Sequence, residues 1–375
     1  MYNPVKLHFG RGVVEQLGDV ISRYGQRVLL TYGGGSIKRN GIYDQVMTQL
    51  RKAGVDVFEF PGIRPNPIIE DVDAAAALGR EKQVDVILAV GGGSVIDSSK
   101  IISITIPVDH SGWDFVKGKA KPISAVPLLT VLTLAATGSE MNRFAVTQNN
   151  ATKEKLGYGD ILTYPKESFL DPSYTFSVPA NYTGYGITDL VAHALEAYFG
   201  DGEATLSDRF VFSIVREAIE YGPLLLNDPL NYRLREIIMY AATCALNNLT
   251  TYGRKNGDWG VHSLGHTLSV LYDIPHGASL SIVYPAWLRF HLAKIPDRIA
   301  ELGKNLFGVN TAEETIDALE GFFKTVQSPV RLSEAGINTA DKGDEIFRTF
   351  ASNRAGGNLH KFNEEGYREL IRLMA

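Results

Sequence analysis

The sequence predicts two domains, an α/β domain followed by an all-helical domain. Its 375 residues exceed the size at which a single core usually keeps growing. Apolar strand patterns alternate with helical stretches in the first half, as in a parallel sheet covered on both faces. After about Pro179 only helical patterns remain. We therefore expect domains at residues 1–179 and 180–375.

Composition narrows the possible partners and compartment. The chain is 45% hydrophobic and 21% charged, with a formal net charge of -5, so no basic surface for nucleic acid or membrane is expected. No apolar run reaches the roughly 20 residues of a membrane span. Cys244 is the only cysteine and lies among small apolar residues, so we expect a buried thiol and no internal disulfide. With no visible signal peptide, a cytoplasmic protein is predicted.

Strands and helices follow in order along the first domain. Val5, Leu7 and Phe9 alternate with polar residues, which predicts a strand with His8 on its solvent side. Apolar runs and turn residues predict the remaining strands at 27–32, 55–60, 84–90 and 123–128, with helices at 43–53 and 69–82.

Two of these strands end in glycines. Residues 27–32 run into Gly33-Gly34-Gly35, and residues 84–90 run into Gly91-Gly92-Gly93. Glycines let a backbone approach a ligand closely, and the helix that follows offers N–H groups to a pyrophosphate. Neither loop has Gly-x-Gly-x-x-Gly or Walker spacing, so a plain turn is the alternative. Candidate cofactor-binding residues are Gly35, Ser36, Lys38, Gly91, Gly92, Gly93, Ser94, Asp97, Thr133, Thr137 and Lys155.

The second half concentrates histidines at metal-ligand spacing. Asp189 and His193 are four residues apart, as are His262 and His266, so each pair shares one helix face. His276 follows Pro275 at a predicted loop or helix start. Imidazole and carboxylate without cysteine suit Zn²⁺ or Fe²⁺. The alternative to a metal site is that these pairs lie on solvated helix faces. The residues alone leave five candidate metal ligands. The other histidines are predicted to be structural or on the surface: His110, His291 and His360.

Several motifs together resemble the iron-containing (group III) alcohol dehydrogenases, and most closely their NADP(H)-dependent butanol dehydrogenase branch. They are Gly91-Gly92-Gly93-Ser94-x-x-Asp97-x-x-Lys100, Ala136-Thr137-Gly138-Ser139-Glu140, Asp189-x-x-x-His193-x-x-x-Glu196, and His262-x-x-x-His266 followed by Pro275-His276-Gly277. The resemblance covers nearly the whole chain.

This resemblance implies a Rossmann-like first domain, an all-helical second domain of the dehydroquinate-synthase type, a cleft between them and a homodimer. It also implies the metal ligands Asp189, His193, His262 and His276. His266 matches a position near the substrate, and we hypothesise that it relays a proton, since imidazole titrates near neutral pH.

The implied activity is metal-dependent hydride transfer between NADP(H) and a primary alcohol or aldehyde, short-chain such as butanol and butyraldehyde. NADP(H) is favoured because Gly35-Ser36-Ile37-Lys38 carries a hydroxyl and an amine but no acid to repel a 2′-phosphate. The rival is a lyase of the dehydroquinate-synthase type, which needs basic residues for a substrate phosphate. No Lys or Arg lies between Asp189 and Glu196, which weakens that rival. A binding protein without catalysis is the third alternative.

Overall fold

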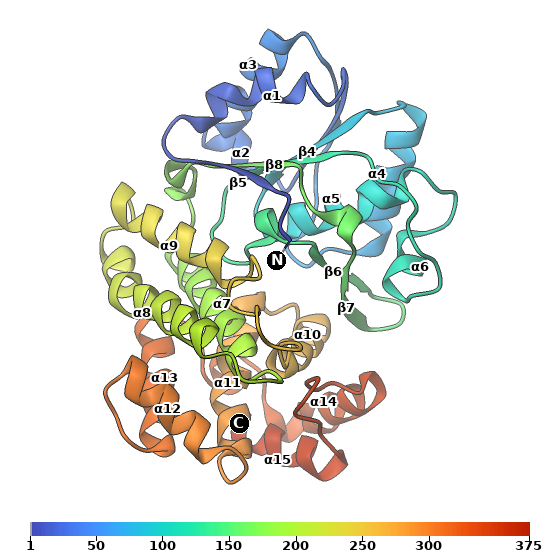
Figure 1. Cartoon of the computed structure of the whole chain (residues 1–375). Helices are drawn as coiled ribbons and strands as arrows, with labels where there is room; N and C mark the ends of the chain where they lie inside the picture. Colours follow the sequence, from blue (N-terminus) through green and yellow to red (C-terminus); the bar gives the residue numbers. More distant parts are fainter. Residues whose placement is uncertain (1) are drawn as a thin grey trace. The chain divides into compact units, whose positions relative to one another are not determined.

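The computed structural model describes residues 2–375, which form two compact units that divide between Val178 and Pro179. Figure 1 shows a sheet with helices in the first unit and helices alone in the second. Among the described residues, no helix combines the length and apolar character needed to cross a membrane.

The first unit contains a six-stranded, wholly parallel sheet in the order β1-β8-β5-β4-β2-β3, and a separate antiparallel hairpin of β6 and β7. The strands are β1 (Lys6–Phe9), β2 (Arg27–Tyr32), β3 (Asp56–Phe60), β4 (Val86–Gly91), β5 (Leu128–Leu132), β6 (Phe144–Asn149), β7 (Glu154–Gly159) and β8 (Glu167–Leu170). The α-helices are α1 (Leu17–Ile21), α2 (Ser36–Arg39), α3 (Ile42–Ala53), α4 (Ile69–Glu81), α5 (Gly93–Thr105) and α6 (Gly112–Val116). Short 3₁₀ helices are η1 (Val13–Gln16), η2 (Ser139–Met141), η3 (Ile161–Thr163) and η4 (Pro172–Thr175).

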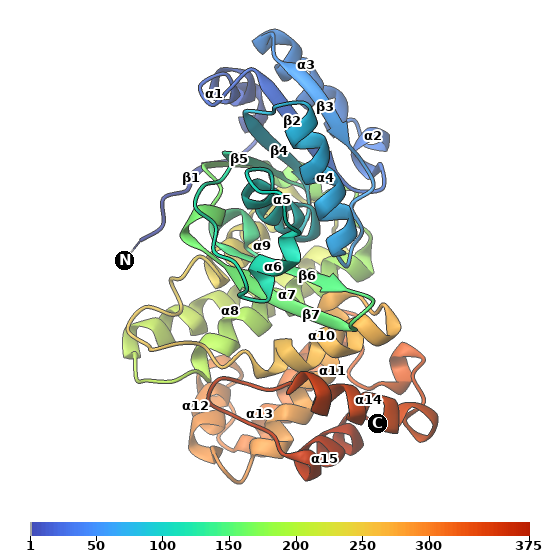
Figure 2. The same ribbon diagram turned by 90° about the vertical axis from the view of Figure 1, so that its right-hand side faces the viewer.

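Helices cover both faces of this sheet, so its central strands are buried on both sides and are largely apolar. Every residue of β4 is buried, because a strand in the middle of a two-sided sheet meets solvent on neither face. α1, α2 and α3 pack their apolar residues on one face, against Leu30, Leu88 and Val131. α4 and α5 lie on the opposite face (Figure 2).

The strand predicted at residues 123–128 is wrong. Strand β5 begins only at Leu128, and Ile123 is 88% exposed. Pro122 and Pro127 have no N–H to donate to a ladder, so the segment between them cannot pair regularly. The apolar run that forms the strand is the one after Pro127, whose carbonyl accepts the first cross-strand hydrogen bond from Ile87.

The prediction for His8 is also wrong. Its ring does not face solvent: the side chain is only 8% exposed, Nε2 lies 2.6 Å from Glu167 Oε2, and the ring stacks on Phe169. Both partners belong to β8, which pairs in parallel with β1. They lie about 160 residues further along the chain, so alternation within β1 could not reveal them.

The second unit is all-helical, as predicted, and is built around α7 (Ala180–Tyr198). Every residue of α7 from Gly186 to Tyr198 is buried, as expected for a helix surrounded by others. The helices around it are α8 (Thr205–Asn227), α9 (Tyr232–Ala245), α10 (Gly260–Tyr272) and α11 (His276–His291). Cys244, on α9, is buried as predicted. The outer elements are α12 (Pro296–Leu306), α13 (Ala312–Thr325), η5 (Ser333–Ala335), α14 (Thr339–Asn353) and α15 (Glu364–Met374).

Candidate metal centre and nucleotide-binding edge

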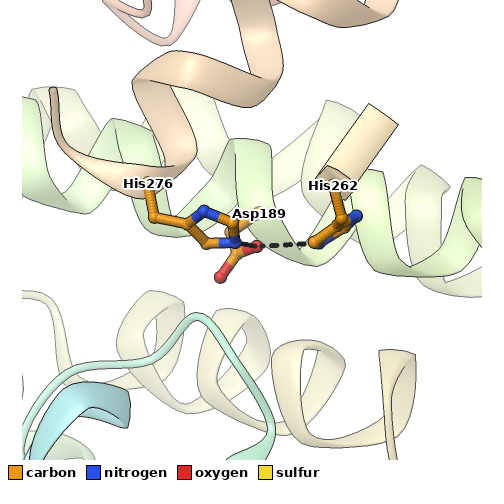
Figure 3. A group of neighbouring side chains, drawn as sticks. All are labelled: Asp189, His262 and His276. Atoms are coloured by element: carbon orange, nitrogen blue, oxygen red, sulfur yellow. Dashed lines mark ion pairs between the residues drawn. The ribbon is translucent and has the colours of Figure 1, made fainter. Parts of the chain in front are cut away.

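Three helices of the second unit bring a carboxylate and three imidazoles together. α7 carries Asp189 and His193 one turn apart, α10 carries His262 in its first turn, and α11 begins at His276. Oδ1 of Asp189 lies 3.5 Å from Nε2 of His193, 3.7 Å from Nε2 of His262 and 3.6 Å from Nε2 of His276. Figure 3 shows His262 and His276 on either side of the Asp189 carboxylate.

These distances fit a metal ion. Ligands about 2.1 Å from a tetrahedral ion are roughly 3.4 Å from one another, which is close to the separations here. One ligand atom each from Asp189, His262 and His276 lies within 4.8 Å of the other two. Oδ1 of Asp189 and Nε2 of His262 are buried and accept no hydrogen bond from the described protein. A buried polar atom of this kind needs a partner, and a divalent cation supplies one.

A glycine makes this convergence possible. A Cβ on Gly277 would lie 2.1 Å from the backbone oxygen of Tyr185, so only glycine lets the start of α11 approach α7 this closely. Pro275 comes just before the helix, where its missing N–H costs nothing and its ring restricts the backbone. The contact at Gly277 therefore fixes His276 beside Asp189.

Glu196 holds His262 in place. Its Oε1 accepts hydrogen bonds from the backbone N–H of His262 at 2.9 Å and from ring Nδ1 at 3.0 Å. Nδ1–H is thereby engaged, and Nε2 is directed toward Asp189. Burial by itself would lower the pKa of His262, but the carboxylates of Asp189 and Glu196 raise it to about 9. For His193, burial dominates over Asp189 and lowers the pKa to about 4.

The turn that leads into α10 is also anchored. Trp259 adopts a left-handed conformation with φ of 64°, which is uncommon for a bulky residue and is maintained only by its surroundings. The fully buried Asp258 accepts backbone hydrogen bonds from Gly260, Leu359 and His360. Burial, with a contribution from Glu196, raises the pKa of Asp258 to about 6. The Trp259 ring lies 5.3 Å from His262. The turn thus sets the position of His262 from the N-terminal side.

His266 lies beside the four candidate ligands. Its ring centroid is 5.2 Å from that of His276 and 6.3 Å from that of His262. It is on α10, one turn after His262, and faces the same side. The ion pairs of Asp189 Oδ1 are with His193, His262 and His276, whereas the contacts of His266 are with the rings of His262 and His276.

The glycine loops of the first unit meet at one edge of the sheet. Strands β2, β4 and β5 are neighbours and parallel, so their carboxyl ends share an edge. Gly33–Gly35, Gly92 and Thr133 follow these ends directly. β2 pairs with β3 on one side and β4 on the other, so the strand order reverses here, where open α/β sheets bind nucleotides.

Two glycines shape this edge. Gly35 has φ of 92° and precedes Ser36 and Lys38 on α2. A Cβ on Gly93 would lie 2.4 Å from the side chain of Thr137, so the first turn of α5 and the loop after β5 can touch only through glycine. This close contact places the N-terminus of the 13-residue α5 at the carboxyl ends of the strands. Its first backbone N–H groups can there donate hydrogen bonds to an anion.

Asp97 and Lys100 hold the surrounding loops. The carboxylate of Asp97 accepts hydrogen bonds from Ser139 Oγ at 2.5 Å and from the backbone of Val146 at 2.9 Å. Lys100 is fully buried and donates hydrogen bonds to Ser139 Oγ, Asn142 Oδ1 and the Phe144 carbonyl. Burial lowers the pKa of Lys100 to about 8. This network joins α5 to η2 and the β6–β7 hairpin.

The hairpin carries the last candidate residue, Lys155. Its ammonium is buried and donates to Asn66 Oδ1 at 2.8 Å. Ser94 Oγ donates to the carbonyl of Pro65, in the same loop as Asn66. The loop at residues 65–67 therefore connects the first turn of α5 with the hairpin. Strands β6 and β7 were not predicted from the sequence, because their apolar alternation is weak.

Comparison with known proteins identifies the family. Residues 4–172 match the iron-containing alcohol dehydrogenases, and residues 183–374 match the C-terminal part of that family. The chain is 44% identical to the probable NADH-dependent butanol dehydrogenase 1 of Bacillus subtilis, over 99% of this chain and 98% of that protein. It is 36% identical to the NADPH-dependent aldehyde reductase YqhD of Escherichia coli, over 90% of this chain and 89% of that protein.

The fold matches as well. The crystal structure of NADH-dependent butanol dehydrogenase A from Thermotoga maritima superposes with a TM-score of 0.96, at 36% identity, and covers 100% of this chain and 98% of that chain. These matches confirm the expected α/β and all-helical architecture and favour a dehydrogenase over a lyase. The protein belongs to the family of iron-containing alcohol dehydrogenases, a family of oxidoreductases whose members use a nicotinamide cofactor and a divalent metal.

Proposed function

We propose that the protein interconverts short-chain aldehydes and primary alcohols, such as butyraldehyde and butanol, using NADP(H) and a divalent ion, Fe²⁺ or Zn²⁺. The observation that carries the proposal is the placement of three imidazole Nε2 atoms 3.5–3.7 Å from Asp189 Oδ1. Relatives named as butanol dehydrogenases and an aldehyde reductase support the substrate class.

Asp189, His193, His262 and His276 would hold the ion. When bound, the ion would polarise a carbonyl or alcohol oxygen, and the nicotinamide would supply or accept the hydride. The protein contributes a buried carboxylate that offsets part of the cation's charge, and Glu196 orients His262. Nitrogen and oxygen ligands accept either ion, so both are expected to support activity to different degrees.

His266 has the place of a proton relay in this proposal. It lies on the same face of α10 as His262, and its ring is 5.2 Å from that of His276. Reduction of an aldehyde requires a proton as well as a hydride, and a neighbouring imidazole can deliver it. His266 is partly exposed as a residue, although its Nε2 atom is buried.

Preference for NADP(H) is supported by the loop after β2. No acidic residue lies between Gly33 and Lys38, whereas Ser36 and Lys38 offer a hydroxyl and an ammonium at the start of α2. An acidic side chain at that point would repel a 2′-phosphate. Relatives are named for either cofactor, so we expect NADPH to be preferred but NADH to be accepted.

The test is a steady-state measurement of cofactor oxidation with the purified, metal-loaded protein. Linear aldehydes of increasing chain length would be supplied with NADPH or with NADH. The proposal predicts turnover of butyraldehyde and a higher kcat/KM with NADPH. Turnover with NADH alone would refute the cofactor assignment. Absence of turnover with every aldehyde, both cofactors and both metals would refute the activity.

A further inference from the structure

A carboxylate on the strand next to β2 reaches the same edge as Lys38. Glu59, the penultimate residue of β3, accepts hydrogen bonds from the phenols of Tyr32 at 2.5 Å and Tyr43 at 2.6 Å. Its Oε2 also lies 3.5 Å from Nζ of Lys38. The side chain of Glu59 is 33% exposed and that of Lys38 is 48% exposed, so a ligand at this edge can reach both.

The parallel register explains how these residues meet. Glu59 pairs with Leu30, so it projects from the same face of the sheet as Leu30 and Tyr32. α3 covers that face and places Tyr43 edge-on to Tyr32 at 5.9 Å. Lys38, from α2, lies over both rings, 5.1 Å from the centroid of Tyr32 and 4.5 Å from that of Tyr43. The cluster is therefore built by three separate elements around the carboxyl end of β2.

Glu59 is ionised in this setting. Burial alone would raise its pKa, but the hydrogen bonds from Tyr32 and Tyr43 and the charge of Lys38 lower it below the usual value. Burial and the bond to Glu59 raise the pKa of Tyr43 to about 12, so the phenol remains a donor. A negative charge is thus fixed beside the only cation of the loop at residues 33–38.

We propose that Glu59 is a specificity-determining residue that limits the preference for NADP(H) by neutralising Lys38 and repelling the 2′-phosphate. The proposal rests on the proposed function, because it requires that the first unit binds a nicotinamide dinucleotide at this edge. In dinucleotide-binding sheets, an acidic residue beyond the glycine loop favours a ribose hydroxyl over a 2′-phosphate. A 2′-phosphate carries about -1.5 to -2 charges, so a nearby carboxylate opposes it.

Equilibrium binding tests this without catalysis. Dissociation constants for NADP⁺ and NAD⁺ would be measured by titration calorimetry on wild type and E59Q, which keeps size and polarity but removes the charge. We expect the affinity for NADP⁺ relative to NAD⁺ to rise about five- to tenfold in E59Q, as for one unit charge acting through partly screened solvent. K38M should shift the same ratio in the opposite direction.

Asp56 provides the matched control. Asp56 is the first residue of β3, at the opposite end of the strand from Glu59, and its side chain is 73% exposed. It forms an ion pair with Arg27, the first residue of β2. D56N removes the same charge from the same strand and should leave the NADP⁺ to NAD⁺ ratio unchanged. An unchanged ratio in E59Q or in K38M, or an equal shift in D56N, would overturn the inference. If wild type bound neither nucleotide, the proposed function itself would fail instead.

Discussion

A single oxygen of Glu196 accepts hydrogen bonds from both the backbone and the ring of His262. Two donors from one residue fix both the position of the chain and the rotation of the imidazole. Neither residue is near the other in sequence: they meet because α10 packs on α7. The metal affinity of the centre should depend on this contact.

The first prediction concerns Glu196. E196Q keeps the shape but weakens the acceptor and removes a charge, so the affinity for Zn²⁺ should fall about 10- to 100-fold. Competition with a chromogenic chelator measures it. E217Q, which alters an exposed glutamate on α8, is the control and should bind as wild type does. Equal affinities of E196Q and wild type would show that His262 needs no such support.

The second prediction concerns the start of α11. G277A would place a Cβ 2.1 Å from the Tyr185 oxygen, so the first turn must shift and carry His276 with it. We expect loss of most bound metal and a lower free energy of unfolding, by about 2 kcal/mol or more. Metal analysis and urea unfolding report the two effects. G321A, at an open and exposed helical position, should be neutral or slightly stabilising. Full metal content in G277A would contradict this account of the convergence.

The third prediction concerns His266. H266A should lower kcat about 100-fold, the low end for loss of a proton-transfer group, and alter the pH–rate profile. Its metal content should remain that of wild type, whereas H262A should lose metal and activity together. If H266A kept both turnover and the pH profile, the relay would be elsewhere.

The fourth prediction concerns pH and His291. This residue is 1% exposed, its ring packs against Trp287 and His360, and neither ring nitrogen has a hydrogen-bond partner in the described protein. Burial, together with His360 and Lys294, lowers the pKa of His291 to about 3. Its contribution to stability is therefore complete above the unfolded pKa of 6.5 and is lost as the pH falls from 6.5 toward 3.

The H291F variant has no imidazole at this position, so it should not show this loss of stability at low pH. Between pH 6.5 and 4.5 the free energy of unfolding of wild type should fall relative to that of H291F, by up to about 1.4 kcal/mol per pH unit. Urea unfolding of both metal-free proteins across this pH range measures the difference in their free energies of unfolding. Titrating groups that the two proteins share contribute to both values and therefore cancel in the difference. Parallel loss of stability in the two proteins would show that His291 does not contribute.

Local patterns in the sequence predicted much of this structure. One-turn spacing is a property of a single helix, so Asp189 with His193, and His262 with His266, could be paired from sequence alone. The glycine loops after β2 and β4 were evident for a similar reason, because each follows its own strand directly.

What the sequence could not predict depends on distant contacts. The choice of His276 over His266 as a ligand came only from the family resemblance. The contact of Gly277 with α7, which brings His276 close to Asp189, could not be predicted from sequence. The partner of His8 is on a strand far along the chain. The role proposed for Glu59 could not be predicted from the sequence of its own strand. It depends on contacts with Tyr32, Tyr43 and Lys38, which strand register and helix packing bring to it.

We propose that hydride transfer requires a divalent ion held by Asp189, His193, His262 and His276. The most direct measurement follows NADPH oxidation by butyraldehyde before chelation, after chelation, and after Fe²⁺ or Zn²⁺ is restored, in wild type and in D189N. We expect chelation to abolish the rate in wild type and at least one ion to restore it, whereas neither ion should restore the rate in D189N. A rate that survives complete removal of metal, or full recovery in D189N, would contradict this proposal.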